Sequence, residues 1–332
     1  FMPSPQLLAV QRAPPSFFSM IFDFKKRVEA RIQSLYFEPE ASFVAGLLLG
    51  SRKGLPEELT LAFQRTGLSH IVAISGYNIS LLVAVLFYVL SFLNFKKRIL
   101  FSSVGILIFV ILVGASAAVL RAGLMGLLTL WGLYAGRKSQ ALFGLLWSAL
   151  IMTLINPYTL VYDIGFQLSF AATLGILLFH PMLAGLFPDW KKFLWVREPL
   201  LLTLSAQITT TPFMLLYFGR FSLISPLANL LVAPLIPLAM LFSGLSLLFG
   251  KTAAMSAWVY LKGAEMVALG FAKIPFADFA WQISSAEFFA SLFFLIAILI
   301  RFYKPTLLRS FGLDPGASFY KLSNRESGKR EK

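Results

Sequence analysis

The stretch from Gly67 to Ser80 places several polar side chains at the start of a run of apolar residues. Ser69, His70, Ser75 and Asn78 can all donate and accept hydrogen bonds. Polar groups are costly in hydrocarbon, so proteins that keep them in apolar segments usually use them. Ser75 and Asn78 are three positions apart and share one face of a helix. The stretch therefore predicts either a polar face that lines a pathway or a hydrogen-bonded contact between helices.

Two charged residues interrupt the later apolar runs. Arg121 follows one run and precedes another, so a tight hairpin would place it at a membrane interface. There it would serve as an anchor, or it would project into a cavity and meet phosphate, because arginine forks onto phosphate oxygens and stays charged when buried. Asp163 precedes a helical run, a position typical of a helix N-cap. It is also a candidate partner for Arg121.

Three uncharged amides complete the candidate polar set. Gln167 lies one helical turn after Asp163. Asn229 lies between Pro226 and Pro234, where a broken backbone is tolerated if it lines a cavity. Gln207 belongs to a polar stripe of helical spacing that favours a wet groove over a simple helix contact, with the members Thr203, Gln207, Thr210 and Thr211. By contrast, Lys262 and Glu265 are three apart and are expected to neutralise each other as a structural pair.

The composition indicates an all-α polytopic membrane protein. The chain is 58% hydrophobic and 13% charged, and its apolar runs are continuous rather than alternating, which excludes a β-barrel. There is no cysteine and there are only two histidines, His70 and His180, so disulfides, thiolate chemistry and a histidine-rich metal site are excluded. No cofactor is expected.

The apolar runs predict a bundle of about nine membrane-crossing helices with broken or re-entrant segments. The expected crossings are residues 69–93, 99–119, 121–136, 140–155, 164–181, 199–218, 227–249, 254–272 and 286–303. Prolines break the segment 222–250. The apolar segment 41–50 is too short to span, and is expected to be re-entrant or packed inside the bundle. Residues 51–64 are polar and contain Glu57 and Glu58, which suit the first turn of a helix.

The chain divides into three regions in this interpretation. Residues 1–40 form an extracytoplasmic N-terminal remnant with an amphipathic interfacial helix that starts near Ser16. Residues 41–304 form the transmembrane domain, and residues 305–332 form a basic cytoplasmic tail. The net charge of +14 is concentrated in alternate loops and in this tail. The positive-inside rule then predicts an N-terminus outside and a C-terminus in the cytoplasm.

Several enzyme signatures are missing from the sequence. There is no glycine-rich phosphate loop with its lysine, so the chain is not expected to hydrolyse ATP. No serine, histidine and aspartate have a spacing that indicates a catalytic triad. We expect no catalytic residues and no enzymatic activity.

Five sequence blocks resemble the competence domain of the ComEC family, the inner-membrane channel proteins of natural transformation. They are Gly46-Leu-Leu-Leu-Gly50, Gly67-Leu-Ser-His-Ile-Val-Ala-Ile-Ser-Gly76, Arg121-Ala122, Gly165-Phe-Gln-Leu-Ser-Phe170 and Ala228-Asn-Leu-Leu-Val-Ala-Pro234. The resemblance covers about residues 40–300. The first two blocks are together quite specific, and the last three gain weight from their order.

The resemblance implies passage of single-stranded DNA through the cell membrane into the cytoplasm. It also implies a DNA-receptor protein and a cytoplasmic helicase-type ATPase as partners, besides membrane lipid, and it is compatible with a homo-oligomer. The family pattern usually has a histidine where this chain has Asn78, and leucine more often than Tyr77 before it, so a role for imidazole there does not carry over. The family's nuclease-like metallo-β-lactamase domain has no counterpart in this sequence.

On this interpretation the polar set Ser69, His70, Ser75, Asn78, Arg121, Asp163, Gln167, Gln207 and Asn229 lines the DNA pathway or the bundle core. Two alternatives stay open. The first is a secondary transporter of a small or lipid-linked anion, with its site at the broken segment 222–250 and a titrating Asp163. The second is a membrane-embedded hydrolase that uses His70.

Overall fold

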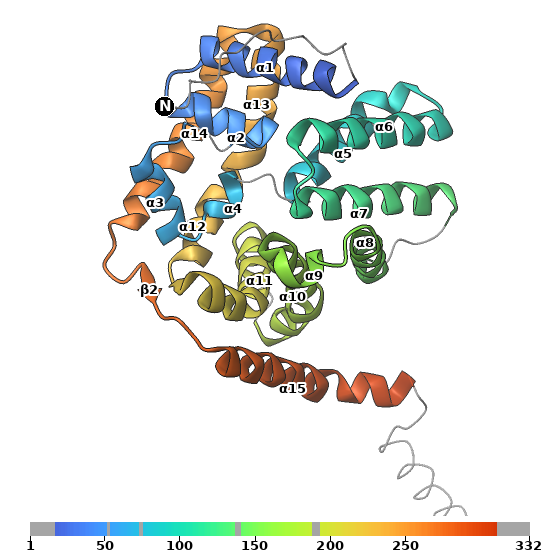
Figure 1. Ribbon diagram of the computed structural model, residues 1–332, viewed down its shortest axis with the longest axis vertical. Helices are drawn as coiled ribbons and strands as arrows, with labels where there is room; N and C mark the ends of the chain where they lie inside the picture. The colour runs from blue at the N-terminus through green and yellow to red at the C-terminus, as the bar shows by residue number, and fades with distance from the viewer. Residues whose placement is uncertain (1–16, 52–53, 73–75, 137–140, 188–192, 311–332) are drawn as a thin grey trace, which may run out of the picture.

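The computed structural model describes residues 17–51, 54–72, 76–136, 141–187 and 193–310, and within them it is almost entirely helical (Figure 1). The elements in chain order are α1 (Phe17–Leu35), α2 (Glu40–Leu49), α3 (Glu57–Arg65), α4 (Ser69–Val72), α5 (Gly76–Val89), the short 3-10 helix η1 (Leu90–Phe92), α6 (Phe95–Val113), α7 (Ala117–Tyr134), α8 (Ala141–Ile155), α9 (Thr159–Tyr162), α10 (Ile164–Leu186), α11 (Leu194–Phe218), β1 (Arg220–Ser222), α12 (Ser225–Val232), α13 (Leu235–Phe249), α14 (Lys251–Ala272), β2 (Asp278–Ala280) and α15 (Ser285–Ser310).

The helices do not share one direction. In Figure 1, α6, α7 and α15 run across the view, α14 runs along it vertically, and α8, α10 and α11 are seen close to end-on. The two strands form a small antiparallel pair in which Phe221 faces Phe279. This pair joins the end of α11 to the chain between α14 and α15, where only loops were expected from the sequence.

One hydrophobic core is formed by residues of α1 to α4 together with α12, α13 and α14. The buried face of α14 is made of small residues, and Ala257, Ala264 and Ala268 are each fully buried. Small side chains let neighbouring helices approach closely, and van der Waals contact then holds them together. The apolar helix α2 lies inside this core, with Phe43, Val44 and Leu47 at most 1% exposed. Of the two expectations for residues 41–50, packing inside the bundle is therefore the one observed.

The predicted helix that starts near Ser16 is confirmed as α1 within the described residues. Its Ile32 is fully buried, whereas Met20, Phe22 and Phe24 are more than half exposed. The glutamates Glu57 and Glu58 do form the first turn of α3, as expected. They suit that place because carboxylates stabilise the positive end of the helix dipole. The N-terminal residues 1–16 and the tail beyond residue 310 lie outside the described residues.

Length and composition make four helices able to cross a membrane within the described residues, which does not confirm the expected nine. They are α7, α10, α11 and residues Ser285–Tyr303 of α15; the pair α12 and α13 adds a fifth if it is counted as one span. This pair is bent by 42°, which confirms the break that prolines predict within residues 222–250. Helices α5 and α8 have 14 and 15 residues, and are too short for a full crossing of about 20 residues.

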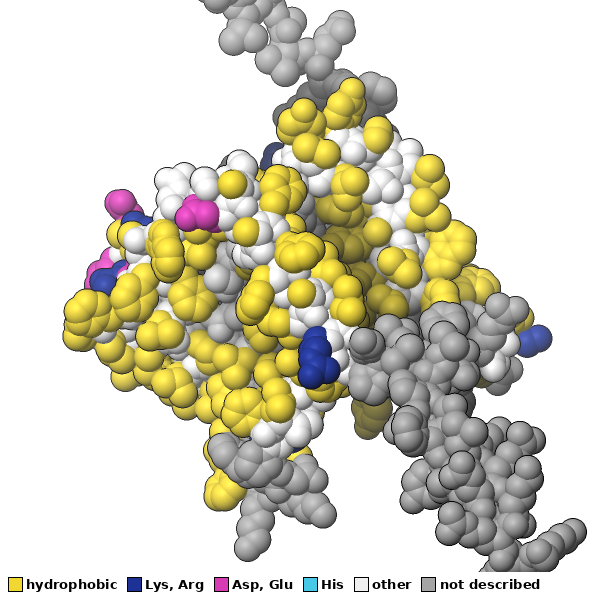
Figure 2. Space-filling model, turned by 90° about the horizontal axis from the view of Figure 1, so that it is seen from below, with side chains coloured by type: hydrophobic (Ala, Val, Ile, Leu, Met, Phe, Trp, Pro, Cys, Tyr) yellow, Lys and Arg dark blue, Asp and Glu magenta, His cyan; other side chains and the backbone are white. Residues whose placement is uncertain are grey.

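The surface of the molecule is mainly hydrophobic. Figure 2 shows one face, covered largely by hydrophobic side chains with few charged groups between them. On α15, the side chains of Phe289, Phe293 and Phe294 are 64–74% exposed. Apolar patches of this kind require a lipid or protein partner, and they agree with the membrane class that the composition indicates.

Helices α10 and α11 form a close pair around Gly175. A Cβ atom at Gly175 would overlap the hydroxyl of Thr209 and press on the carbonyl oxygen of Ser205. The Thr209 hydroxyl donates a hydrogen bond of 2.7 Å to the carbonyl oxygen of Ala171 on α10. Around Gly175 the close approach thus depends on a missing side chain and on this hydrogen bond. Nearer the other end of the pair, Arg197 Nη2 donates to the carbonyl oxygen of Ala184 at 2.8 Å.

Gly175→Ala is expected to lower the free energy of unfolding by about 1–3 kcal/mol, because it overpacks this contact. The matched control is Gly185→Ala on the same helix, where a Cβ atom would meet no heavy atom within 4 Å. Thermal unfolding of both variants in detergent measures the difference. Equal stability of the two variants would contradict the packing that we describe.

Candidate functional site

The turn between α3 and α4 lies at the centre of the candidate site. Its Gly67 has φ of +69°, a left-handed conformation that glycine adopts without strain. A Cβ atom here would lie 2.7 Å from both Cβ and Oγ of Ser225, the first residue of α12. The turn can therefore rest against α12 only because residue 67 has no side chain.

Two serines connect this turn to predicted site residues on other elements. The amide of Asn229 donates a hydrogen bond of 3.1 Å to Ser225 Oγ, and Asn229 is 7% exposed. The hydroxyl of Ser222 donates to the carbonyl oxygen of Arg65 at 2.8 Å. Gln207 Nε2 donates to the carbonyl oxygen of Ser222 at 3.1 Å. Asn229 and Gln207, distant in sequence, are thus both held at the Gly67 turn.

The predicted residues that follow the turn differ in exposure. Ser69 and His70 are exposed at the start of α4, and His70 Nδ1 lies 3.0 Å from the carbonyl oxygen of Gly67. Asn78, in the first turn of α5, is only 2% exposed. Ser75 lies outside the described residues. The imidazole thus contacts the backbone of its own turn, and the hydrolase alternative built on His70 stays a hypothesis.

A second glycine joins α2 to α4. A Cβ atom on Gly46 would lie 3.2 Å from the carbonyl oxygen of Val72, which is tighter than ordinary contact. Gly46 belongs to the first sequence block and Val72 to the second. The two blocks therefore meet closely, at both the backbone and the side chain of Val72.

Arg121 lies inside a helix and not in the expected hairpin turn. The chain turns at Gly114 and Ala115, both with positive φ, and α7 begins at Ala117. Arg121 is therefore the fifth residue of α7, and it is 8% exposed. The hairpin therefore turns at residues 114–116, where Gly114 and Ala115 have positive φ, and not beside residue 120 as the expected crossings 99–119 and 121–136 imply.

The guanidinium of Arg121 lies between α5 and α10. A Cβ atom on Gly76 would be 3.1 Å from its Nη2 atom, and its Cζ atom lies 5.9 Å from the ring centre of Phe170. Its Nε atom is buried without a hydrogen-bond partner, and no ion pair joins Arg121 to any described residue. A buried cation without an anion is costly, so this position suits a ligand that brings negative charge.

Helix N-termini surround the same position. Gly76 is the first residue of α5, and Arg121 is in the second turn of α7. Each helix N-terminus carries a partial positive charge and backbone N–H groups that lack helical partners. The two N-termini therefore add to the positive potential of the guanidinium instead of neutralising it.

Asp163 and Gln167 form a separate local structure. Asp163 is the N-cap of α10, where its carboxylate accepts a hydrogen bond of 2.9 Å from the Phe166 N–H. Gln167 Nε2 donates to the carbonyl oxygens of Leu160 and Val161 at 3.0 and 2.9 Å. The N-cap interpretation of Asp163 is thus confirmed. The alternative partnership with Arg121 is absent among the ion pairs of the described residues.

Three threonines of the polar stripe on α11 form hydrogen bonds within their own helix, and the wet groove expected there stays a prediction. The hydroxyls of Thr203, Thr210 and Thr211 each donate to the carbonyl oxygen four residues earlier in their own helix, at 2.7–2.9 Å. Such bonds satisfy a hydroxyl in an apolar environment without any partner from another element. Gln207 is the member of this stripe that reaches another element.

Sequence reasoning missed three residues that organise the site: Ser222, Ser225 and Phe170. The serines lie next to the predicted break at residues 222–250, but nothing in their local pattern indicates a contact with Gly67. Phe170 belongs to a quoted sequence block and stacks on Phe166 with ring centres 4.2 Å apart. Because Phe170 lies one helical turn after the predicted site residue Gln167, helical spacing could have identified it as part of the site.

Five ion pairs join other charged groups of the described residues. Lys262 Nζ lies 2.9 Å from Glu265 and 3.6 Å from Glu40, in agreement with the expected structural pair. Arg65 pairs with Asp278 of β2 at 3.0 Å. Within the part of the chain that the structure describes, no three histidine, aspartate or glutamate residues gather as a metal site.

Comparison with known proteins finds one family, described as Competence protein, which matches residues 47–306. ComE operon protein 3 of Bacillus subtilis (strain 168) is 31% identical over 225 residues, which are 67% of this chain and 28% of that protein. An uncharacterized protein of Aquifex aeolicus (strain VF5) is 32% identical over 202 residues, which are 60% of this chain and 45% of that protein. The chain thus matches less than half the length of these two relatives. No solved structure matches the chain.

Gly67→Ala is expected to destabilise the protein more than Gly136→Ala, by a difference of about 1–3 kcal/mol. Both glycines have a similar positive φ, of +69° and +67°, so the backbone strain of the substitution is matched. Only at Gly67 would the new methyl group collide with Ser225, whereas at Gly136 it meets open space. Thermal unfolding in detergent measures both changes, and equal losses would contradict the close contact at Gly67.

Proposed function

The chain belongs to the competence protein family, and from this premise we propose that it is a channel component that moves single-stranded DNA across the cell membrane during natural transformation. DNA would enter from the outer side and leave in the cytoplasm. The name of the Bacillus subtilis relative, which refers to the ComE operon, agrees with a role in competence. The helices of spanning length supply the membrane part of this function.

The observation that carries the proposal is the buried, unpaired guanidinium of Arg121. A DNA strand has one negative charge per nucleotide, and proteins bind it chiefly through its phosphates. Arg121 is 8% exposed and has no carboxylate partner among the described residues, so a phosphate would be its first full counter-charge. The N-termini of α5 and α7 favour the same anion.

The aromatic neighbours of Arg121 position the cation rather than the bases. Phe166 is 3% exposed and stacks on the partly buried Phe170, so Phe166 has little surface to offer a nucleobase. The Phe170 ring instead lies 5.9 Å from the guanidinium carbon, within the range of a cation–π contact. We propose that Phe170 holds the guanidinium in place for successive phosphates.

The remaining parts of the proposal concern orientation and partners. The chain would lie in the inner membrane of the cell. Its N-terminal segment would be outside and its C-terminus in the cytoplasm. A DNA-receptor protein would deliver the strand, and a cytoplasmic helicase-type ATPase would supply the energy, because we propose no catalytic activity for this chain. Membrane lipid and a second copy of the chain are further proposed partners.

Arg121→Gln is expected to reduce transfer of labelled DNA into the cytoplasm by about tenfold or more, because it removes the charge-assisted contact to phosphate. Arg121→Lys keeps the charge and loses the fork, so it should fall between the wild type and the glutamine variant. The measurement is uptake of labelled DNA in a transformable host that depends on this gene, with surface-bound DNA and membrane protein level determined in parallel.

The matched control is Arg98→Gln on α6, which also removes an arginine that contacts an aromatic ring, since Arg98 Cζ lies 3.6 Å from the ring centre of Phe87. This variant should keep most of the uptake. Normal uptake in Arg121→Gln at normal protein level would remove Arg121 from the DNA path. Normal uptake after deletion of the whole gene would overturn the channel proposal and favour the transporter of small anions.

A further inference from the structure

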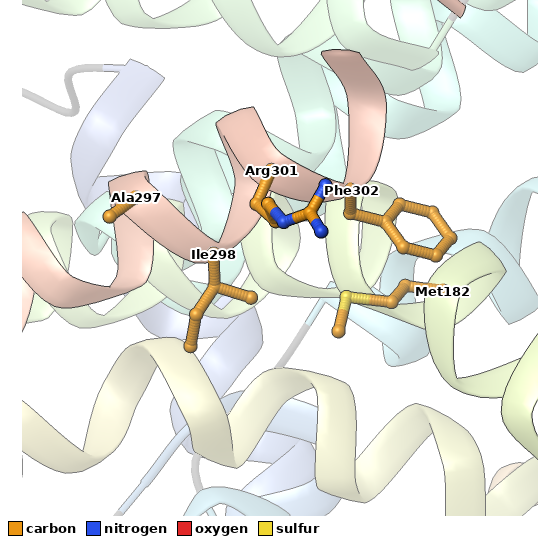
Figure 3. A pocket seen from close by; sticks show the side chains of 5 residues that line it. All are labelled: Met182, Ala297, Ile298, Arg301 and Phe302. Carbon is orange, nitrogen blue, oxygen red and sulfur yellow. The ribbon is translucent and has the colours of Figure 1, made fainter. Parts of the chain in front are cut away.

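A shallow, open cavity of about 510 Å³ lies at the surface between α10 and α15, away from the site around Arg121. Its walls are Met182 on α10 and Ala297, Ile298, Arg301 and Phe302 on α15 (Figure 3). The α15 residues follow helical spacing and present one stripe toward Met182. Four of the five walls are apolar, and the fifth is a cation.

Contacts at two levels explain why the helices leave this space. Near the start of α15, the Phe288 ring packs edge-on against Phe213 of α11, with ring centres 5.0 Å apart. Farther along, the hydroxyl of Tyr303 donates a hydrogen bond of 2.9 Å to the carbonyl oxygen of Leu178, one turn before Met182. Between these two levels, Met182 of α10 lies across the cavity from Ala297 and Ile298 of α15, and the cavity opens to the surrounding medium.

Both walls belong to helices of membrane-spanning length and composition. The candidate span of α15 runs from Ser285 to Tyr303, so Arg301 lies within its last turn. The apolar wall residues Ala297 and Ile298 lie deeper in the span, on the side of the hydrocarbon. A ligand that fits must therefore have an apolar part along Ile298 and an anionic part at Arg301.

Arg301 is free to bind an anion. It is exposed, and it has no ion pair or hydrogen bond to any described residue. Glu198, near the start of α11, is not available as a partner for Arg301. Its two carboxylate oxygens already contact Arg197 at 2.9 Å and His180 at 3.0 Å. Loop charges predict that this end of the helices faces the cytoplasm, where the leaflet contains anionic lipid.

We propose that this cavity binds one anionic phospholipid, with an acyl chain along Met182 and Ile298 and the phosphate at the Arg301 guanidinium. Arginine binds phosphate through two parallel hydrogen bonds, which an exposed lysine cannot reproduce. The lipid would fill the gap between α10 and α15 and fix α15 against the rest of the protein. This site is independent of the DNA path.

Native mass spectrometry of the full chain in detergent tests this proposal. The protein is titrated with phosphatidylglycerol and with phosphatidylcholine of the same acyl chains. The wild type should retain one phosphatidylglycerol in preference to phosphatidylcholine. Arg301→Gln should reduce this preference by about tenfold, because it removes the charge-assisted contact to the phosphate. Met182→Trp should lower retention of both lipids, because the larger side chain fills the cavity.

The matched control is Lys251→Gln, which removes an exposed cation at the start of α14, outside the cavity. It should leave the lipid preference unchanged. The proposal is overturned if Arg301→Gln keeps the wild-type preference, if Met182→Trp keeps wild-type retention, or if Lys251→Gln loses as much preference as Arg301→Gln. Displacement of the bound phosphatidylglycerol by a short oligonucleotide would also overturn it, since the cavity would then be a nucleic-acid site.

Discussion

Close backbone approach at a few glycines is the constraint on which the rest of the structure depends. Gly67 rests on Ser225, Gly46 on the backbone of Val72, and Gly76 on the guanidinium of Arg121. Helices in an apolar medium gain little from hydrophobic burial, so the distance at which their backbones pack largely decides their association. These contacts bring together segments that are up to 158 positions apart in sequence. A methyl group at Gly67 would collide with Ser225, whereas at Gly76 the neighbour is the flexible end of the Arg121 side chain, which can shift by a few tenths of an ångström.

The same packing buries the positive charge of Arg121 without a negative partner among the described residues, and this charge favours an anionic ligand. Leaving a buried charge without its partner typically costs about 3–5 kcal/mol. The Phe170 ring offsets only part of that cost, since a cation–π contact contributes about 0.5–2 kcal/mol. The N-termini of α5 and α7 bring further positive potential. A phosphate that passes Arg121 would offset this positive charge at each step, which gives a physical reason for an unpaired arginine inside a membrane protein.

Local patterns predicted local features correctly. The spacing of apolar residues gave α1, the glutamates at 57 and 58 gave the first turn of α3, Asp163 proved to be an N-cap, and the prolines marked the bend between α12 and α13. Arg121 was misplaced because hydropathy continues through the turn at Gly114 and gives no signal for it. Hydropathy also could not separate spanning helices from short apolar ones such as α5 and α8. The contact between Gly67 and Ser225 could not be predicted, because no local pattern records which distant residue fills the space beside a glycine.

Cross-linking of DNA to a cysteine placed beside Arg121 tests the central claim most directly. The chain has no cysteine of its own, so Gly76→Cys provides a single reactive thiol, with Gly132→Cys at the other end of α7 as its control. The probe is a single-stranded oligonucleotide with a bromoacetamide group on one phosphorothioate, presented to cells during uptake. We expect the oligonucleotide to attach at residue 76 and not at residue 132, because phosphates pass the Arg121 guanidinium. Attachment at neither residue, or equally at both, would contradict the claim that DNA passes this site.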